Sequence, residues 1–249
     1  MVAGRVRVSH RPIRRIVGDP AVALPEGGWP LTIPAVVQLL NQGLEPGGLT
    51  VIVGDNGSGK STIVEGIAMA FGMSPEGGST LAAHSTRGTE SSLHSWVRIT
   101  RGVGGSRWGY FIRAETMHGL YTYLEENRSL RGDNTEYHRF SHGESVMSLI
   151  GSRFSTSGLY VLDEPEAGLA FETTLALALR LWDLARDVRS QVIIATHSPI
   201  LAAIPGAQVY EVGPWGWRPA VWEELPLVQH WRRFLSRPEA YLDPLDASD

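Results

Sequence analysis

A glycine-rich segment, GDNGSGKST at residues 54–62, places the strongest constraint on the fold of this chain. It fits the pattern G-x-x-x-x-G-K-[ST], in which backbone amides curl around a polyphosphate. The β-branched apolar run 49–53 precedes it and predicts a buried strand, and the apolar spacing over 60–71 predicts a helix that ends at Gly72. This order of strand, loop and helix predicts a helix N-terminus that faces bound phosphate.

The loop contains the residue types that a magnesium nucleotide requires. Lys60 is the only lysine among 22 lysines and arginines, and its compact ammonium suits a position crowded by backbone amides. The hydroxyl of Ser61 is predicted to bind Mg²⁺. The residues predicted to bind the nucleotide are Gly54, Asp55, Asn56, Gly57, Ser58, Gly59, Lys60, Ser61 and Thr62.

A second apolar run, 158–162, ends in two acids, Asp163 and Glu164. In enzymes with such a loop, an aspartate at this strand end holds the metal shell, and an adjacent carboxylate can polarise the attacking water. Asp163 is therefore predicted as a metal ligand and Glu164 as the catalytic base. A plain acidic turn before Pro165 is the simpler alternative.

Composition narrows the class of protein. With 249 residues, 43% hydrophobic and 19% charged, we expect one soluble α/β domain that includes a small lobe. There is no cysteine, which excludes disulfides and thiolate metal sites, and no apolar run is long enough to span a membrane. We therefore expect a cytoplasmic protein.

The charge gives little reason to expect nucleic acid, because the formal net charge is −4. The exception is the N-terminal segment, which is rich in arginine. The alternation of arginine and valine over 5–8 favours an edge strand with a solvated face over a phosphate-binding patch. The basic residues of that segment are Arg5, Arg7, Arg11, Arg14 and Arg15.

Further elements predict a mostly parallel central sheet with helices on both faces. Strands are expected at 191–195 and 208–212, and helices at 169–188 and 228–235. The runs 96–100 and 108–112, separated by RGVGGSR, predict a hairpin. We expect a single domain over 1–249, in which about 73–150 forms an inserted lobe with a small antiparallel β part and a short helical part.

Four motifs in order resemble the ATP-binding-cassette (ABC) class of P-loop ATPases. They are the loop at 54–62, FSHGES at 140–145, DEPEAGL at 163–169 and THSP at 196–199. More narrowly, the chain looks like small stand-alone AAA/ABC-type ATPases with an S-H-G-E-S signature, over about 29–242. The resemblance implies ATP and Mg²⁺ as cofactors, hydrolysis to ADP and phosphate, and a head-to-tail homodimer with two ATPs between its subunits.

The same resemblance assigns roles beyond the loop. Ser141 and Gly143 match signature positions that reach the γ-phosphate bound by the opposite subunit. His197 matches the switch histidine, so Lys60, Glu164 and His197 are the predicted catalytic residues. Ser141 and Glu144 also fit a capping box, and His197 before Ser-Pro is also compatible with a structural histidine.

The chain departs from the common family pattern at His142, Glu144 and Ala170, where glycine, glutamine and aspartate are usual. In place of the glutamine loop, Glu115 is predicted as a metal ligand with Arg113 close by, and an ordinary charge pair at a strand end is the alternative.

No aromatic residue is predicted to stack on adenine, and Trp29 is expected to pack under the sheet.

The sequence favours a soluble switch or motor ATPase over the nucleotide-binding subunit of a membrane transporter. Only 25 residues lie between Glu115 and Ser141, too few for the helical lobe with which transporter subunits grip their membrane partner. A link to DNA repair, defence or other nucleic-acid work rests on related ATPases and the basic N-terminus. A binding module without turnover is a third reading, which Glu164 disfavours. The protein client is not predicted.

Overall fold

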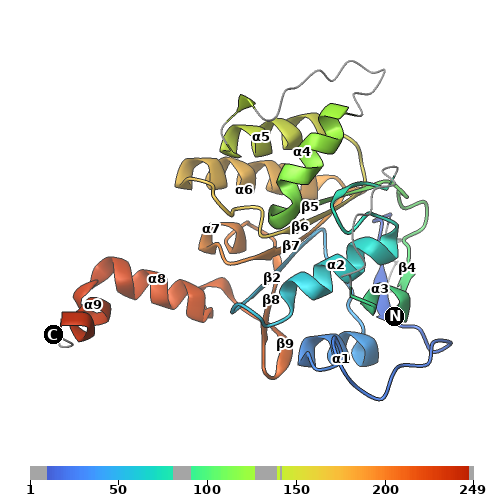
Figure 1. Cartoon of the computed structure of the whole chain (residues 1–249), viewed down its shortest axis with the longest axis horizontal. Helices are drawn as coiled ribbons and strands as arrows, with labels where there is room; N and C mark the ends of the chain where they lie inside the picture. The colour runs from blue at the N-terminus through green and yellow to red at the C-terminus, as the bar shows by residue number, and fades with distance from the viewer. Residues whose placement is uncertain (1–9, 81–90, 127–138, 141, 247–249) are drawn as a thin grey trace, which may run out of the picture.

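The computed structural model describes residues 10–80, 91–126, 139–140 and 142–246 (Figure 1). Its centre is a seven-stranded sheet in the order β3-β5-β6-β7-β2-β8-β9. The five inner strands run parallel: β2 (Leu49–Gly54), β5 (Gly109–Arg113), β6 (Leu159–Asp163), β7 (Gln191–Thr196) and β8 (Gln208–Gly213). The short edge strands β3 (Gly78–Ser79) and β9 (Gly216–Pro219) pair antiparallel. The predicted mostly parallel α/β fold is confirmed.

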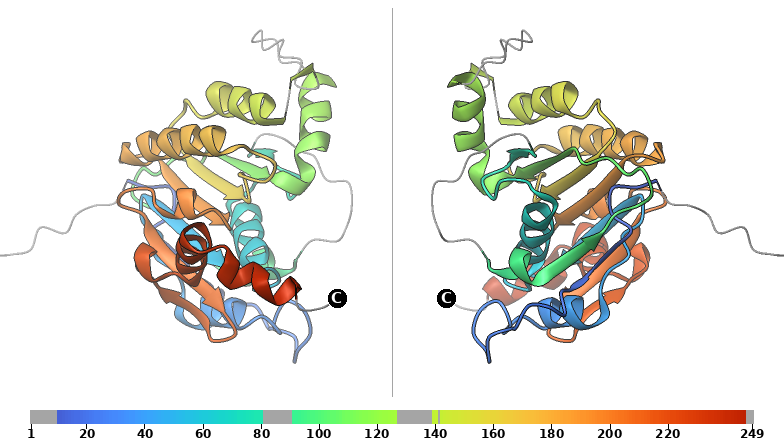
Figure 2. Two further views of the ribbon diagram at one scale, coloured as in Figure 1. Left: turned by 90° about the vertical axis from the view of Figure 1, so that its left-hand side faces the viewer. Right: turned by 90° about the vertical axis from the view of Figure 1, so that its right-hand side faces the viewer.

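Helices cover both faces of the sheet, and two hydrophobic cores result (Figure 2). The helices α1 (Pro34–Gln42), α2 (Lys60–Phe71) and α3 (Leu93–Trp96) contribute to one core. The helices α4 (Met117–Glu126), α5 (His142–Arg153), α6 (Phe171–Arg186) and α7 (Pro199–Ala202) contribute to the other.

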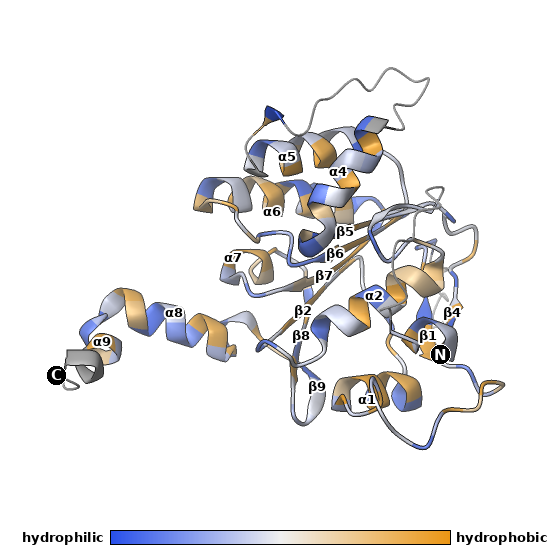
Figure 3. Ribbon diagram, in the orientation of Figure 1, coloured by the Kyte–Doolittle hydropathy of each residue, from blue (hydrophilic) through white to orange (hydrophobic). Residues whose placement is uncertain are grey.

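The inner strands are apolar along almost their whole length because both of their faces are buried, as Figure 3 shows for the hydrophobic residues at the centre of the sheet. The β6–β7 register places Leu162 beside Ile194, and all of β6 is buried. The carboxyl ends of these parallel strands therefore lie at one edge of a rigid sheet, which is where ligands bind in such folds.

The predicted hairpin between 96–100 and 108–112 is wrong. β4 (Val97–Thr100) pairs with β1 (Arg15–Gly18) in a separate two-stranded sheet, whereas β5 pairs with β6 in the main sheet. The burial of the two strands explains the difference: four of the five residues of β5 are buried, but only one of the four residues of β4. The predicted N-terminal strand at 5–8 lies outside the described residues.

The C-terminal part extends away from the body of the molecule (Figure 1). After the turn η3 (Trp222–Glu224), α8 (Pro226–Ser236) and α9 (Glu239–Asp246) form this arm. The predicted helix at 228–235 lies within α8, and β8 pairs with the strand β9 that follows it. Among the described residues, no helix is long and apolar enough to cross a membrane.

Candidate nucleotide-binding site

The glycine loop connects β2 to α2 at the carboxyl edge of the sheet, as predicted. Gly59 caps α2 with a φ of 98°, and a Cβ atom there would lie 2.4 Å from Cγ2 of Ile33. A side chain at this position would therefore be both strained and blocked. No side chain caps the helix start, so the first amide groups of α2 can donate to a ligand.

Lys60 lies at the bottom of this loop and is 3% exposed. Its Nζ donates to the carbonyl oxygen of Asp55 at 3.0 Å and lies 2.8 Å from Nε2 of His197. Burial lowers the pKa of Lys60, while the charges of Glu164 and Asp163 act in the opposite direction. The lysine is thus a partly desolvated cation held at the start of α2.

The three residues predicted as catalytic come together in space. Nε2 of His197, from the end of β7, lies 3.2 Å from Oε1 of Glu164 at the end of β6. Nε2 also contacts the ammonium of Lys60, and a nitrogen that accepts from an ammonium is unprotonated. Nε2 of His197 therefore lies between the ammonium of Lys60 and the carboxylate of Glu164, within hydrogen-bonding distance of both.

Glu164 has an unusual backbone conformation. Its φ is 49°, and it is the only non-glycine residue with positive φ in the part of the chain that the structure describes. Its amide donates to the carbonyl oxygen of Ala195 at 2.9 Å, which holds the turn in place. Such strain persists only where surrounding contacts impose it, and it is frequent at functional sites.

Glu166 holds the loop that carries His197, a role that the sequence did not predict. Its Oε1 accepts from Oγ1 of Thr196 at 2.6 Å and from the amide of His197 at 2.8 Å. The side chain therefore fixes the end of β7 relative to the end of β6. Its place in the DEPE segment was visible in the sequence, but its partner lies 30 residues away.

Asp163 is buried beside the helix start, where a metal ligand was predicted. Its side chain is 4% exposed and is hydrogen-bonded to Ser61, and its Oδ2 lies 3.7 Å from Nε of Arg113. Burial raises the pKa of Asp163 to about 6, although the Ser61 hydrogen bond and the Arg113 charge oppose the shift. Its Oδ1 has no hydrogen-bond partner among the described residues.

These features fit Mg²⁺, which binds hard oxygen ligands and retains several of its waters. A buried carboxylate oxygen without a partner stands beside a serine hydroxyl.

Glu115 differs in its surroundings, because its side chain is 78% exposed and its Oε2 accepts from Arg113 at 2.9 Å. The structure therefore shows the strand-end charge pair, and a metal contact by Glu115 stays a prediction.

Of the two predicted signature residues, the structure describes Gly143. Gly143 is in the first turn of α5, where a Cβ atom would lie 3.5 Å from Thr173. It does not line the cavity above the loop, and Ser141 lies outside the described residues.

A cavity of about 1190 Å³ opens above the loop. Its floor is formed by the loop with Glu164 and His197, and its outer wall includes Trp29, Trp215 and Trp231. The expectation that Trp29 packs under the sheet is wrong, since this residue is 56% exposed and lines the cavity. Trp29 is exposed because it lies in a loop rich in proline and glycine, and not in a strand or helix that packs on the sheet.

Trp231 of α8 lines both the cavity and a second, apolar groove. It lines the cavity above the loop, and it also lines an apolar groove of about 450 Å³ between α6, α7 and α8. Exposed apolar residues of α6, including Leu175 and Leu179, form the opposite wall of this groove. The exposure of these side chains could not be derived from local sequence, because it depends on where the arm lies.

A buried lysine in a glycine loop after β2, with acids at the end of β6 two strands away in the same sheet, is typical of the P-loop class of nucleotide-binding proteins. A family model described as an AAA domain matches residues 35–166, just over half of the 249 residues. The chain belongs to this AAA domain family, and the predicted relation to P-loop ATPases is confirmed. None of the curated proteins matches the chain.

Several solved structures are similar to the chain at low identity. The SMC head domain from Thermotoga maritima has 14% identity and a TM-score of 0.47, covering 84% of this chain and 99% of that one. A dimeric bacterial ABC transporter cassette has 16% identity and a TM-score of 0.45, covering 75% and 91%. An inward-facing metal-chelate type ABC transporter has 16% identity and a TM-score of 0.44, covering 75% and 77%.

Proposed function

We propose that the protein binds ATP with Mg²⁺ and hydrolyses it to ADP and phosphate, as a cytoplasmic switch or motor ATPase. The observation that carries this proposal is that Nε2 of His197 lies 2.8 Å from Nζ of Lys60 and 3.2 Å from Oε1 of Glu164 at the cavity. A cation that stabilises phosphate charge and a carboxylate that accepts a proton are groups that promote in-line attack on a γ-phosphate, and an imidazole beside them can orient the water.

Each residue has a distinct part in the proposed reaction. The loop amides and Lys60 bind the phosphates, and Lys60 leaves the carbonyl of Asp55 and the ring of His197 to do so. Ser61 and Asp163 would hold Mg²⁺, which neutralises charge on the phosphate oxygens. Glu164 accepts a proton from the attacking water, and His197, freed from Lys60, orients that water.

We propose further that a second copy of the chain completes the site. In support of this, Gly143, the signature residue that the structure describes, does not line the cavity of its own chain. Ser141 and Gly143 of the partner would then cover the γ-phosphate in a head-to-tail homodimer. Closure on ATP and opening after hydrolysis would supply the motion that acts on a client.

The dimer can be trapped with Glu164→Gln, which keeps the shape of the side chain but removes the base. With ATP and Mg²⁺, this variant is expected to elute as a dimer in size-exclusion chromatography, and with ADP as a monomer. Glu45→Gln, at a side chain that is 69% exposed and does not line the cavity, serves as the matched control. A Glu164→Gln protein that holds ATP and stays monomeric would contradict the sandwich model.

A further inference from the structure

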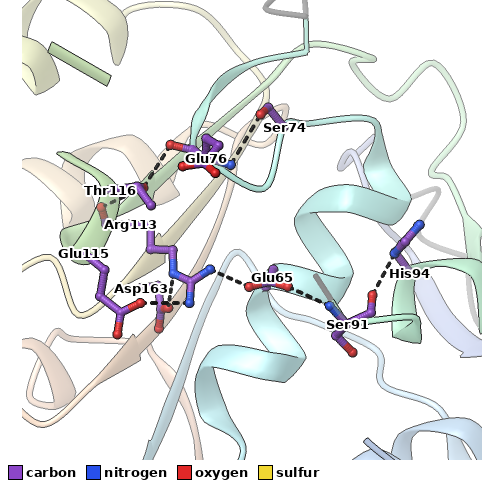
Figure 4. A network of polar contacts seen from close by, with 9 residues as sticks. All are labelled: Glu65, Ser74, Glu76, Ser91, His94, Arg113, Glu115, Thr116 and Asp163. Atoms are coloured by element: carbon purple, nitrogen blue, oxygen red, sulfur yellow. Dashed lines mark hydrogen bonds and ion pairs between the residues drawn. The ribbon is translucent and has the colours of Figure 1, made fainter. Parts of the chain in front are cut away.

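Arg113, the last residue of β5, joins three carboxylates from three elements (Figure 4). One terminal nitrogen lies 2.5 Å from Oε2 of Glu65 on α2, and the other lies 2.9 Å from Oε2 of Glu115. Its Nε lies 3.7 Å from Oδ2 of Asp163 on β6, an ion-pair distance at which Nε makes no hydrogen bond within the described residues. A planar guanidinium can bridge partners in this way because its donors point in fixed, divergent directions.

Glu65 anchors the guanidinium. It follows Ser61 by four residues on α2, so the two side chains lie on the same face of that helix. The residue is 6% exposed, its Oε2 binds Arg113, and its Oε1 accepts from the amide of Ser91 at 3.2 Å. A carboxylate buried to this degree is costly without a cation, so Glu65 and Arg113 hold each other in one geometry.

Asp163 lies next to Arg113 because their strands are paired in parallel with these two residues in register. The predicted metal ligands come from different elements, Ser61 from α2 and Asp163 from β6. Arg113 contacts both elements, α2 through Glu65 and β6 through Asp163. The guanidinium therefore lies on the Oδ2 side of Asp163, while Oδ1 has no hydrogen-bond partner in the described part of the chain.

We propose that Arg113 is a positioning residue for the metal ligand Asp163, and that Glu65 is its anchor. Arg113 holds the Oδ2 side of the carboxylate and leaves Oδ1 directed to a divalent cation shared with Ser61. The inference rests on the proposed function, because it presupposes the magnesium nucleotide. It differs from a surface charge pair in that two of the three carboxylates are buried.

The test measures binding of a metal, with Mn²⁺ as the probe. Electron paramagnetic resonance on the protein with a non-hydrolysable ATP analogue gives the Mn²⁺ concentration for half-saturation, and calorimetry in EDTA gives the affinity for the analogue alone. Arg113→Met is expected to raise the half-saturating Mn²⁺ concentration about tenfold or more and to leave the metal-free affinity within about twofold. Arg113→Lys retains the charge but not the fork, so it is expected to regain thermal stability without regaining Mn²⁺ affinity.

Arg237→Met removes an exposed pair with Glu239 and serves as the control. If Arg113→Met does not fold, the same measurements are made on Arg113→Lys and Glu65→Gln. The first variant keeps a cation beside Glu65, and the second keeps the guanidinium of Arg113. Half-saturation within about twofold of the wild type in folded variants would overturn the inference, as would a parallel loss of metal-dependent and metal-free affinity. A wild-type protein that bound the analogue no better with Mn²⁺ than without it would instead overturn the proposed function.

Discussion

The burial of Asp163 lowers the stability of the folded protein when its carboxyl group is ionised. Its pKa is about 6 in the folded protein and 3.8 in the unfolded chain. Between these values the native state binds more protons than the unfolded state, so the free energy of unfolding falls as the pH rises through this window. The loss amounts to something on the order of 3 kcal/mol above pH 6.

Asp163→Asn is therefore expected to raise the melting temperature of the nucleotide-free protein at pH 7.5 and to abolish Mn²⁺-dependent nucleotide binding. The gain in stability should disappear below about pH 3, where the wild-type residue is mostly protonated in both the folded and the unfolded state. Scanning calorimetry at the two pH values measures it, with Asp183→Asn at an exposed position as the control. A less stable Asp163→Asn protein at pH 7.5 would show that the Ser61 and Arg113 contacts outweigh burial.

Lys60 is expected to contribute to the binding of ATP through both its charge and its small size at this position. Lys60→Ala should weaken binding of ATP by about 10- to 100-fold, since a charge-assisted hydrogen bond to phosphate is lost. Lys60→Arg should also weaken it, because the larger guanidinium does not fit a residue site that is 3% exposed. Calorimetric titration measures both, and an affinity unchanged in Lys60→Ala would remove the phosphate-loop assignment.

At the scale of elements, the loop before α1 forms one wall of the cavity. Trp29 lines it with a side chain that is 56% exposed. Trp29→Ala is expected to lower the affinity for ATP about fivefold to tenfold, because a nucleobase loses an aromatic surface to stack on. Affinity for inorganic tripolyphosphate, which has no base, should not change. Equal losses for both ligands would indicate that the substitution disturbs the phosphate loop itself.

The elements also differ in how far local sequence determines them. The strand before Gly54, the helix from Lys60 and the acidic end of β6 were predictable because each depends on apolar patterns and glycine chemistry within a short span. Asp163 and Glu164 followed from the same pattern. His197 was predicted by resemblance to a family, and the structure brings it to Lys60 across 137 residues of sequence.

What the sequence did not predict depends on distant contacts. The pairing of β1 with β4 joins segments about 80 residues apart, and a turn-like sequence between β4 and β5 favoured a hairpin instead. The contact between Glu65 and Arg113 spans 48 residues, so a buried acid on a core helix gave no local sign of its partner. The exposure of Trp29 could not be predicted for the same reason, since the burial of a side chain depends on the whole folded chain.

At the scale of the whole molecule, the proposed composite site makes a prediction about mixed subunits. Lys60→Ala should inactivate the site of its own subunit, and Gly143→Asp should inactivate the site that its signature helix would cover in the partner. A Cβ atom at Gly143 would meet only ordinary van der Waals contacts, so a side chain can begin there without a backbone shift. In a head-to-tail dimer, a mixed pair retains one intact site.

Equal mixtures of the two inactive variants should therefore recover up to about a quarter of the wild-type ATPase rate, since random pairing gives half mixed dimers with one working site each. Phosphate release after mixing measures the recovery, and either variant mixed with itself is the control. No recovery, with mixed dimers demonstrated by differently tagged subunits, would show that each chain completes its own site.

The solitary lysine also gives the protein a built-in chemical label. Lys60 carries the only side-chain amine in 249 residues, and burial lowers the pKa of that amine, which favours its nucleophilic form. An acylating reagent that is selective for amines and small enough to enter the cavity thus has one side-chain amine to modify. The fraction of the peptide containing Lys60 that gains the mass of the acyl group would report the fraction of cavities without nucleotide. Acylation of Nζ of Lys60 would thus measure how many sites are occupied in a mixed population, without any engineered tag.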